Sequence, residues 1–556
     1  MHVSLTRLAT TSVTAALVFI LVGFPLVMLI GGSFAPPKGE AAISLRAYLV
    51  LFNDIDLLWN SIKVAIGSTI LALAFGVSLA WIVARTNVPF ARTVEQLSII
   101  PFYLSPLLGA VGWAVLAAPS EAGLINGMLM RGLGLAKAPF NIYTEMGIIW
   151  VSGIYFAPFC FLFAVGGLRS MEPSLEESAR VIGSGNFGTA WRITLPLITP
   201  AILGSSLLVF VLAVGQFGVP AVLGMPRGYN VVTTRIYQLV AGFNTDYPAA
   251  AAMGISLFAF SAIGVWLQIK ILGKRKFTTV TGKGYRPRVI DVGSLRWVLF
   301  TVAVFYLLVA VILPLAALVY ASLLRFITSD FATARFTLAN FDYILFQYPT
   351  TQTAIRNTLV LAVGGATLTL GLCAILSWQI IRVRGFVSRM IELLTMVPVA
   401  IPGIVFSLGL LWAWIAVPFL PIYGTLWILL ICYVTIFVPY GVRSISAAMM
   451  QIDPSLEECA VVCGAAWGRV MRTIVLPILR PSLMAAWTLI FVSIVKELSA
   501  SALLYNGKTI VLSVAVYDLW INSSFTRVAA LALIEAFIIF VVLWLARRLT
   551  RSEVVV

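Results

Sequence analysis

The sequence predicts an all-α, polytopic membrane protein with twelve transmembrane helices in two parallel, pseudo-symmetric halves of six. Composition, apolar runs and an internal repeat lead to this fold class. Hydrophobic residues fill 61% of the 556 positions and charged residues only 10%, far below the roughly 25% charged of soluble domains. A soluble fold of this length has too little interior for so much apolar surface, so lipid must cover part of it.

Twelve apolar runs are long enough to cross a membrane, since a spanning helix needs about 20 predominantly apolar residues. The runs lie near 11–32, 60–84, 95–118, 146–168, 199–223, 249–272, 297–323, 357–381, 392–416, 425–448, 480–504 and 527–546. The first run is long for a signal peptide and lacks a small-x-small cleavage site. It is therefore predicted to be an uncleaved first span.

The formal charge of +16 could suggest a nucleic-acid partner, but the cations flank the apolar runs. Lys and Arg gather on the cytoplasmic side of membrane proteins. The largest group begins with Lys274, Arg275 and Lys276 and continues to Arg296. The sequence therefore predicts cytoplasmic termini, membrane lipid as the surroundings and no nucleic acid.

The chain repeats itself. Asn60, Gly67, Trp81, Arg85, Arg92 and Pro101 recur 297 residues later, and Pro158, Glu177, Gly183, Pro196 and Pro200 recur 281 residues later. The first half thus holds 16 extra residues, which we place in the outside stretch around 118–145. Because each half holds an even number of spans, the repeat is parallel, about an axis along the membrane normal.

The repeat sets the expected organisation of the chain. It runs as a first span with an outside loop (1–56), a first core domain (57–272), a basic cytoplasmic linker (273–296), a seventh span with an outside loop (297–352) and a second core domain (353–548).

The five cysteines indicate neither a disulfide framework nor a metal site. Cys160, Cys373 and Cys432 lie in apolar runs, where cysteine behaves as a small buried hydrophobe. Cys459 and Cys463 share one helical face, but thiolate metal sites usually need four ligands, and the one histidine is at position 2. We expect all five to serve packing, with no metal and no catalytic residue.

Two similar polar stretches interrupt the apolar runs. E-P-S-L-E-E-S-A-R-V-I-G spans 172–183 and D-P-S-L-E-E-C-A-V-V-C-G spans 453–464, each in a predicted cytoplasmic loop. In each, a serine followed three residues later by glutamate predicts a capping box, Ser174 with Glu177 and Ser455 with Glu458. The glycines at 183 and 464 predict helix ends.

Each predicted short helix carries one apolar stripe: Leu175, Ala179 and Ile182 in the first copy, Leu456, Ala460 and Cys463 in the second. A helix of about two turns is marginal alone in water. The stripe is therefore predicted to dock on a partner, once per half.

These stretches resemble the EAA loop of binding-protein-dependent ABC importer permeases. The family pattern is Glu-Ala-Ala, three residues, Gly, nine residues and Ile-x-Leu-Pro. Here E-S-A-R-V-I-G is followed nine residues later by I-T-L-P, and E-C-A-V-V-C-G by I-V-L-P. Ser178 and Cys459 replace the first alanine with other small residues.

The resemblance implies the type I ABC importer permease fold and a bacterial inner-membrane location. It also implies two copies of a cytoplasmic ABC ATPase, docked on the EAA helices, and a periplasmic or lipid-anchored solute-binding protein. The expected ATPase-coupling residues are Glu176, Glu177, Ala179, Gly183, Leu195, Pro196, Glu457, Glu458, Ala460, Gly464, Leu476 and Pro477. This chain has no G-x4-G-K-[ST] phosphate loop, so ATP and Mg²⁺ are expected on the partner, and this chain is expected to bind no cofactor and to be no enzyme.

Polar residues inside the apolar runs are candidates for the transport path, since ionisable groups are costly in a bilayer. They are Gln216, Lys496, Glu497 and Glu535, with Glu497 matching Gln216 at the 281-residue offset. The alternative is hydrogen bonding between helices. Asn60 and Asn357, at the outer ends of matched spans, are predicted helix caps.

The run K-E-L-S-A-S-A-L-L after the second EAA loop resembles the iron(III) branch of fused two-domain permeases. Related permeases carry thiamine, polyamines or 2-aminoethylphosphonate, and these substrates stay open. A 6+6 secondary transporter also has parallel halves, but the clearest repeat here lies outside the membrane. The chain lacks the clustered ligand residues that an intramembrane enzyme would need. A passive channel would not need two docking helices.

Overall fold

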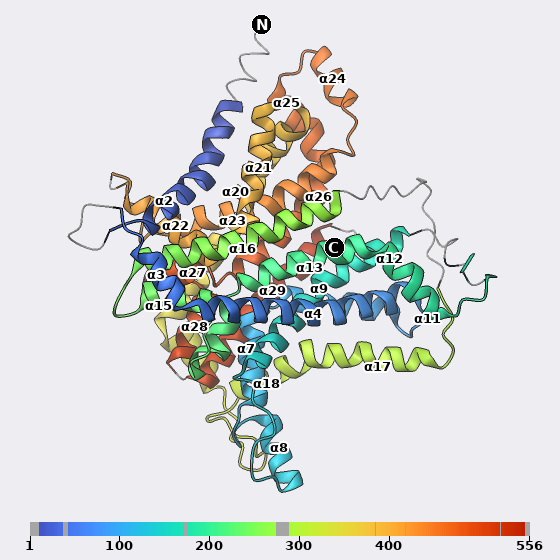
Figure 1. Cartoon of the computed structure of the whole chain (residues 1–556), viewed down its shortest axis with the longest axis vertical. Coiled ribbons are helices and arrows are strands. Elements are labelled where there is room, and N and C mark those ends of the chain that lie inside the picture. The colour runs from blue at the N-terminus through green and yellow to red at the C-terminus, as the bar shows by residue number, and fades with distance from the viewer. Residues whose placement is uncertain are drawn as a thin grey trace.

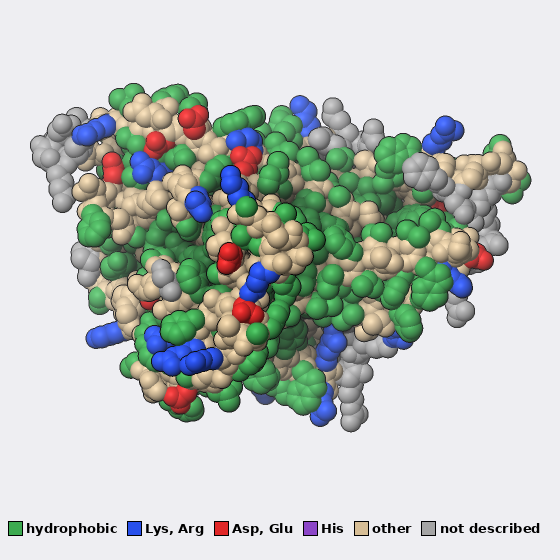
Figure 2. Space-filling model, turned by 90° about the horizontal axis from the view of Figure 1, so that it is seen from below, with side chains coloured by type: hydrophobic (Ala, Val, Ile, Leu, Met, Phe, Trp, Pro, Cys, Tyr) green, Lys and Arg blue, Asp and Glu red, His purple; other side chains and the backbone are tan. Residues whose placement is uncertain are grey.

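The computed structural model describes residues 11–36, 43–171, 176, 178–179, 181–273, 289–383, 385–417, 419–522 and 524–550. Within them every named element is a helix (Figure 1), with two isolated β-bridges. By length and apolar composition, nine helices there are candidate membrane spans, or up to 12 if each of three sharply bent pairs is one span. Figure 2 shows apolar side chains over much of one face, as lipid contact requires.

The candidate spans are Thr11–Ser33, Ile55–Arg85, Glu145–Ser170, Tyr247–Leu267, Leu295–Ser322, Pro349–Arg382, Leu426–Met449, Gly468–Val495 and Phe525–Arg548. They include α2 (Phe24–Ser33), α4 (Ile55–Arg85), α9 (Glu145–Ser170), α16 (Tyr247–Gly273), α17 (Leu295–Leu307), α18 (Leu313–Ser322), α20 (Pro349–Arg382), α23 (Leu426–Met449), α26 (Leu476–Val495) and α29 (Phe525–Thr550). The shorter helices are α3 (Arg46–Asn53), α5 (Ala91–Ser98), α6 (Ile100–Tyr103), α7 (Pro106–Ala117), α8 (Leu124–Leu133), α11 (Asn186–Thr189), α12 (Leu195–Leu197), α13 (Thr199–Val214), α14 (Gly218–Leu223), α15 (Val232–Ala241), α19 (Ala339–Asp342), α21 (Phe386–Ala400), α22 (Gly403–Ile415), α24 (Ser455–Val462), α25 (Trp467–Val470), α27 (Ser501–Leu504) and α28 (Leu512–Ile521).

Two predicted spans, 95–118 and 392–416, are sharply bent rather than straight. The helices on either side of the breaks, 91–103 with 106–117 and 386–400 with 403–415, meet at 96° and 115°. The breaks fall at Ser105-Pro106 and Pro402-Gly403, positions that match at the 297-residue offset. Proline lacks the N–H that would continue the helical ladder and disfavours helical geometry in the residue before it.

Predicted spans 199–223 and 480–504 end earlier than the apolar runs suggest. α13 stops at Val214 and α26 at Val495, and each is followed by a separate short helix, α14 or α27. α13 itself is bent by 63° from the preceding helical segment. Gln216, Lys496 and Glu497 therefore lie in helix breaks, where backbone groups are not committed to the helical ladder.

Spans from matched positions pack in the same way within each half. α4 packs along α9, and α20 packs along α23. At one crossing a Cβ on Gly76 would lie 2.6 Å from the Cys160 Cβ, and at the other a Cβ on Gly441 would lie 2.6 Å from the Cys373 Sγ. Position 373 matches 76, and 441 matches 160. Each crossing therefore pairs a glycine with a cysteine. The glycine is on α4 and the cysteine on α9 in the first half, whereas the cysteine is on α20 and the glycine on α23 in the second half.

The first span of each half packs on the bent helices of the other half. α2 contacts α22, and α18 contacts α7. A Cβ on Gly409 would lie 2.7 Å from the Pro25 carbonyl oxygen, and one on Gly112 would lie 2.9 Å from the Pro314 Cβ. Gly112 and Gly409 match at the 297-residue offset. Each half therefore packs its first span against helices of the other half.

The extra residues of the first half lie where the sequence places them. They include α8, which lies at the end of the molecule opposite α24 (Figure 1). Arg131 of α8 donates to the Ser329 Oγ at 2.6 Å and pairs with Asp330 at 3.7 Å. The insertion is thus fastened to the loop that follows α18, in the second half.

Candidate functional site

The second loop (453–477) carries α24 away from the rest of the chain (Figure 1). No side chain of α24 is buried. Leu456 and Val461 are about half exposed, and Val462 is 88% exposed. Of the predicted stripe, Leu456 and Cys463 are exposed and so available to a partner. Ala460 is partly buried against the core, and its counterpart Ala179 in the first loop is buried.

The predicted capping box of Ser455 and Glu458 does not form. Pro454 holds the N-cap position without a side-chain bond, and the Asp453 Oδ1 accepts from the Ser455 N–H at 2.9 Å. This backbone bond holds the pKa of the Asp453 carboxyl below its usual range. Asp453, one residue before the N-cap, therefore accepts the hydrogen bond of the first N–H of the helix. Glu458 remains exposed.

Both loop glycines end their helices as predicted. Gly183 and Gly464 have φ values of +92° and +81°, the left-handed region that favours glycine. The next residue donates back five positions in each case, Ser184 to the Ala179 carbonyl and Ala465 to the Ala460 carbonyl, both at 3.0 Å. These are the bonds of a Schellman ending.

Glu457 points into the protein and anchors the second loop. Its carboxylate accepts from the Arg382 Nε at 2.8 Å and from the Trp378 Nε1 at 3.2 Å. Arg382 also donates to the Ile452 carbonyl at 2.9 Å. The arginine at the end of α20 thus binds both the carboxylate and the backbone of the loop.

The first loop (172–196) has the matching anchor. Glu176 is 4% exposed, and its Oε1 accepts from the Thr194 hydroxyl at 2.7 Å. It also pairs with the Arg85 Nε at 3.7 Å, while Arg85 donates to the Leu168 carbonyl at 2.9 Å. Glu177, with residues 172–175, lies outside the described residues.

The adjacent glutamates of the second loop therefore have different surroundings. Glu457 is held by Arg382, whereas Glu458 faces solvent beside the exposed apolar residues. The anchoring role of Arg85 and Arg382 was not predicted from the sequence. The signal was present, since Arg85 and Arg382 were among the repeated positions.

The prediction that all five cysteines serve packing is partly wrong. Cys160, Cys373 and Cys432 are buried, but Cys459 of α24 and Cys463, which caps the end of α24, are exposed. Leu195-Pro196 begins α12 and Leu476-Pro477 begins α26, each after a five-residue π-helical turn, Ala190–Thr194 or Met471–Val475. Val181 and Ile182 of the first loop are more than 85% exposed.

The predicted path residues Gln216, Lys496 and Glu497 lie in helix breaks where the two halves touch. We call residues 215–218 and 496–500, with Phe102, Pro402 and Gly403, the junction. A Cβ on Gly215 would lie 3.1 Å from the Pro402 Cβ, and one on Gly218 would lie 3.2 Å from the Leu498 side chain. The two breaks of each half therefore pack on those of the other.

The polar groups at the junction make different hydrogen bonds in the two halves. The Gln216 Oε1 accepts from the Ser152 hydroxyl at 2.6 Å. The Glu497 Oε1 accepts from the Ala500 N–H at 3.0 Å, at the start of α27. Lys496 donates to the Phe102 carbonyl, across the two halves.

Glu535 lies apart on α29 and is 1% exposed. An aromatic cluster lies beside the junction, where the Phe217 ring lies 5.1 Å from that of Tyr237 and 5.4 Å from that of Tyr517.

Asn60 and Asn357 are not helix caps, because α4 begins at Ile55 and α20 at Pro349. Asn60 instead donates to the Asn230 carbonyl at 3.2 Å and Asn357 to the Ile510 carbonyl at 2.9 Å. They tie each second span to the segment that precedes α15 or α28.

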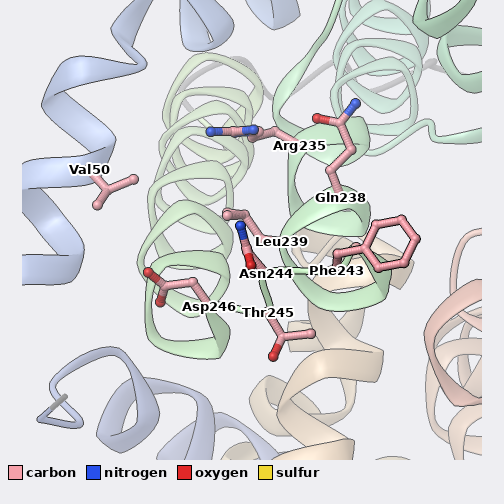
Figure 3. A pocket seen from close by; sticks show the side chains of 9 residues that line it. Val50, Arg235, Gln238, Leu239, Phe243, Asn244, Thr245 and Asp246 are labelled. Atoms are coloured by element: carbon pink, nitrogen blue, oxygen red, sulfur yellow. The ribbon is translucent and has the colours of Figure 1, made fainter. Parts of the chain in front are cut away.

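An open pocket of about 630 Å³ lies between α3, α15 and the loop 242–246 (Figure 3). Arg235 in its lining is paired with Asp54 at 3.1 Å. None of the predicted site residues lines this pocket.

Comparisons with known proteins identify relatives of this chain. Residues 368–553 match the family described as binding-protein-dependent transport system inner membrane component. A putative ferric transport system permease protein of Haemophilus influenzae is 29% identical over 493 residues, covering 86% of this chain and 74% of the relative. A ferric transport system permease protein of Actinobacillus pleuropneumoniae is 28% identical, covering 89% of this chain and 71% of the relative.

Among solved structures, a bacterial ABC transporter involved in the import of the acidic polysaccharide alginate aligns with a TM-score of 0.38 and 19% identity. The alignment covers 46% of this chain and 96% of that one. A likeness at this level adds nothing to the assignment.

The apolar helices, the two anchored loops and the junction between the halves fit a membrane transport component. Residues 368–553 carry the binding-protein-dependent transport system inner membrane component, and over 86–89% of its length the chain resembles ferric transport system permeases.

Proposed function

We propose that this chain is the transmembrane permease subunit of an ATP-driven importer of ferric iron. A binding protein outside the membrane delivers the iron, and a pair of cytoplasmic ATPase subunits drives the passage. The chain crosses the bacterial inner membrane twelve times in two parallel halves, with both termini in the cytoplasm. ATP and Mg²⁺ belong to the ATPase partner.

The observation that carries the proposal is the arrangement of the two loops. Each loop is fixed to its own half by a buried or half-buried glutamate–arginine pair, Glu176–Arg85 and Glu457–Arg382. The second loop presents Glu458 and an exposed apolar surface on α24. A partner that binds this surface moves the end of α20 with it, because Arg382 joins the two. A 6+6 secondary transporter needs no such pair of surfaces.

The ATPase partner is tested by Glu458→Lys. Because Glu458 is exposed and accepts no hydrogen bond from the described part of the chain, the folded protein should keep its thermal stability. The reversed charge should abolish co-purification of the ATPase and reduce ATP-dependent uptake at least tenfold. Glu121→Lys, an exposed site near α8, is the matched control and should leave co-purification unchanged. Persistence of both co-purification and uptake in Glu458→Lys would refute docking at this loop.

Iron as cargo is supported by the ferric permeases among the relatives. The complex is reconstituted in liposomes with its proposed solute-binding protein and supplied with ATP. Uptake of radiolabelled ferric iron should exceed uptake of thiamine, spermidine or 2-aminoethylphosphonate at least tenfold. Tight binding of one of these organic solutes, without iron uptake, would replace the cargo and leave the permease assignment in place.

A further inference from the structure

α15 and α28 occupy the same place in the two halves, and each is ten residues long. The N–H of Val232, where α15 begins, donates to the Ser61 hydroxyl at 2.9 Å. The N–H of Leu512, where α28 begins, donates to the Thr358 hydroxyl at 2.8 Å. Ser61 and Thr358 match at the 297-residue offset. The two helices therefore begin on the same support in each half.

A second pair of matched bonds fixes each of these helices to the helix break before it. The Thr233 hydroxyl donates to the Gln216 carbonyl oxygen at 2.8 Å. The Ser513 hydroxyl donates to the Glu497 carbonyl oxygen at 2.7 Å. These bonds join residues 17 apart in the first half and 16 apart in the second. The offset between α15 and α28 is therefore 280 residues, one fewer than between the two breaks.

At this offset Tyr237 of α15 corresponds to Tyr517 of α28, and the two rings meet. Their centres lie 5.8 Å apart with the ring planes at 78°, the edge-to-face arrangement that aromatic pairs favour. The buried Phe217 ring packs on both, and the Tyr517 hydroxyl also donates to the Met225 Sδ of the first half at 3.7 Å. Equivalent points of two halves can touch only at the axis that relates them. The tyrosine pair therefore lies on that axis.

The halves meet at the tyrosines and diverge toward the two loops. In Figure 1, α15 and α28 lie side by side, whereas α24 points to the top and α11 to the right. α14 contacts α28, and α15 contacts α22 and α27. α13 and α26, the spans that follow the loops, share no extended contact among the described residues. The cores therefore touch along the axis at the end away from the loops.

We propose that Tyr237 and Tyr517, packed on Phe217, form the outer gate of the transport path, and that this gate is closed in this structure. In a parallel repeat, the space between the halves follows the axis that relates them. Rings that meet on this axis block that space. The gate deepens the proposed function and rests on it for orientation, because the two loops mark the cytoplasmic side.

The matched bonds connect the gate to the loops. α13 leads from the first loop to the break at Gln216, and α26 leads from the second loop to the break at Glu497. Drawing the loops together turns each half as a rigid body about the junction. The bonds from Thr233 and Ser513 carry α15 and α28 with the breaks. The tyrosines then separate, and the path opens to the outside as it narrows between the loops.

The test measures leakage through the gate with a probe that does not depend on the natural cargo. The full-length chain is reconstituted in liposomes loaded with calcein, whose fluorescence is quenched when cobalt(II) enters. Without ATP or binding protein, Tyr237→Ala/Tyr517→Ala should admit cobalt(II) at least tenfold faster than the wild type. Tyr237→Phe/Tyr517→Phe keeps both rings and should stay closed. Equal entry through the phenylalanine and alanine variants would overturn closure by the rings.

Phe75→Ala/Tyr306→Ala is the matched control. It removes another aromatic pair between the halves, with ring centres 5.4 Å apart where α4 meets α17. These two positions do not correspond in the repeat, so the pair is not on the axis and the variant should stay closed. Entry as fast as through Tyr237→Ala/Tyr517→Ala would indicate a general packing defect and refute the gate. A folded double alanine variant of the tyrosines that stays closed refutes it as well.

If that double variant does not fold, Tyr237→Ala alone decides, because the Tyr237 side chain is only partly buried. It should raise cobalt(II) entry at least threefold, and entry at the wild-type rate would overturn the gate. The gate and the cargo can fail separately. A wild-type complex that imports no ferric iron with ATP and its binding protein, while the alanine variants admit cobalt(II), would refute the cargo and keep the gate.

Discussion

Arg85→Met is expected to destabilise the protein by about 3–5 kcal/mol, the usual cost of removing one partner from a buried ion pair. The Arg85 side chain is 0% exposed and its partner Glu176 is 5% exposed, so the remaining carboxylate cannot regain water. The first loop should loosen with it, because Glu176 is the described anchor of that loop. Thermal unfolding of the purified protein measures the loss.

The double variant Arg85→Met/Glu176→Met separates this cause from general damage. Replacing both charges by apolar side chains of similar size removes the unpaired charge and should recover most of the stability. Arg356→Met, at an exposed arginine of α20, is the control and should change stability by less than about 0.5 kcal/mol. A double variant no more stable than Arg85→Met would show that the ion pair is not the cause.

Gly76→Cys is expected to cost about 1–3 kcal/mol, because it overpacks the crossing of α4 and α9. The new Cβ would lie 2.6 Å from the Ala157 carbonyl oxygen and 2.6 Å from the Cys160 Cβ. Adding Cys160→Gly should recover at least half of the loss, since the chain already uses this arrangement in the other half as Cys373 and Gly441. Thermal unfolding of the single and double variants checks the prediction.

Gly364→Cys is the matched control. It introduces the same side chain into another long spanning helix, where a Cβ meets nothing within 4 Å, and it should leave the melting temperature unchanged. Equal losses in Gly76→Cys and in the double variant would mean that the exchanged pairs do not determine the helix spacing.

Hydropathy predicted where the spans lie because lipid selects for composition. Hydropathy could not predict the direction of the helices within each apolar run, so the bends of 96° and 115° were not predicted. The prolines at 106 and 402 were the available sign, and they should have broken the runs. The same limit applies to Gln216 and Glu497, which belong to helix breaks although their surroundings in sequence are apolar.

The sequence predicted where the candidate site lies and which residue types form it. It did not predict which side chains turn toward the protein and which toward solvent. The sequence presents Glu457 and Glu458 as equals. Which of them turns inward is decided by Arg382, 75 residues earlier in the chain than Glu457, and a single sequence does not reveal that contact. The capping box does not form for a local reason. The Asp453 carboxylate accepts the hydrogen bond from the Ser455 N–H that the Glu458 carboxylate would accept in a capping box.

The exchanged first spans have a consequence for synthesis. α2 ends at Ser33 and its partner α22 begins at Gly403, 370 residues later. At 5–20 residues per second, the ribosome needs roughly 20–70 s to make that stretch. For that time the face of α2 that will contact α22 has no native partner. Lipid or the insertion machinery must shield it, and the first half reaches its final packing only when most of the second half has been made.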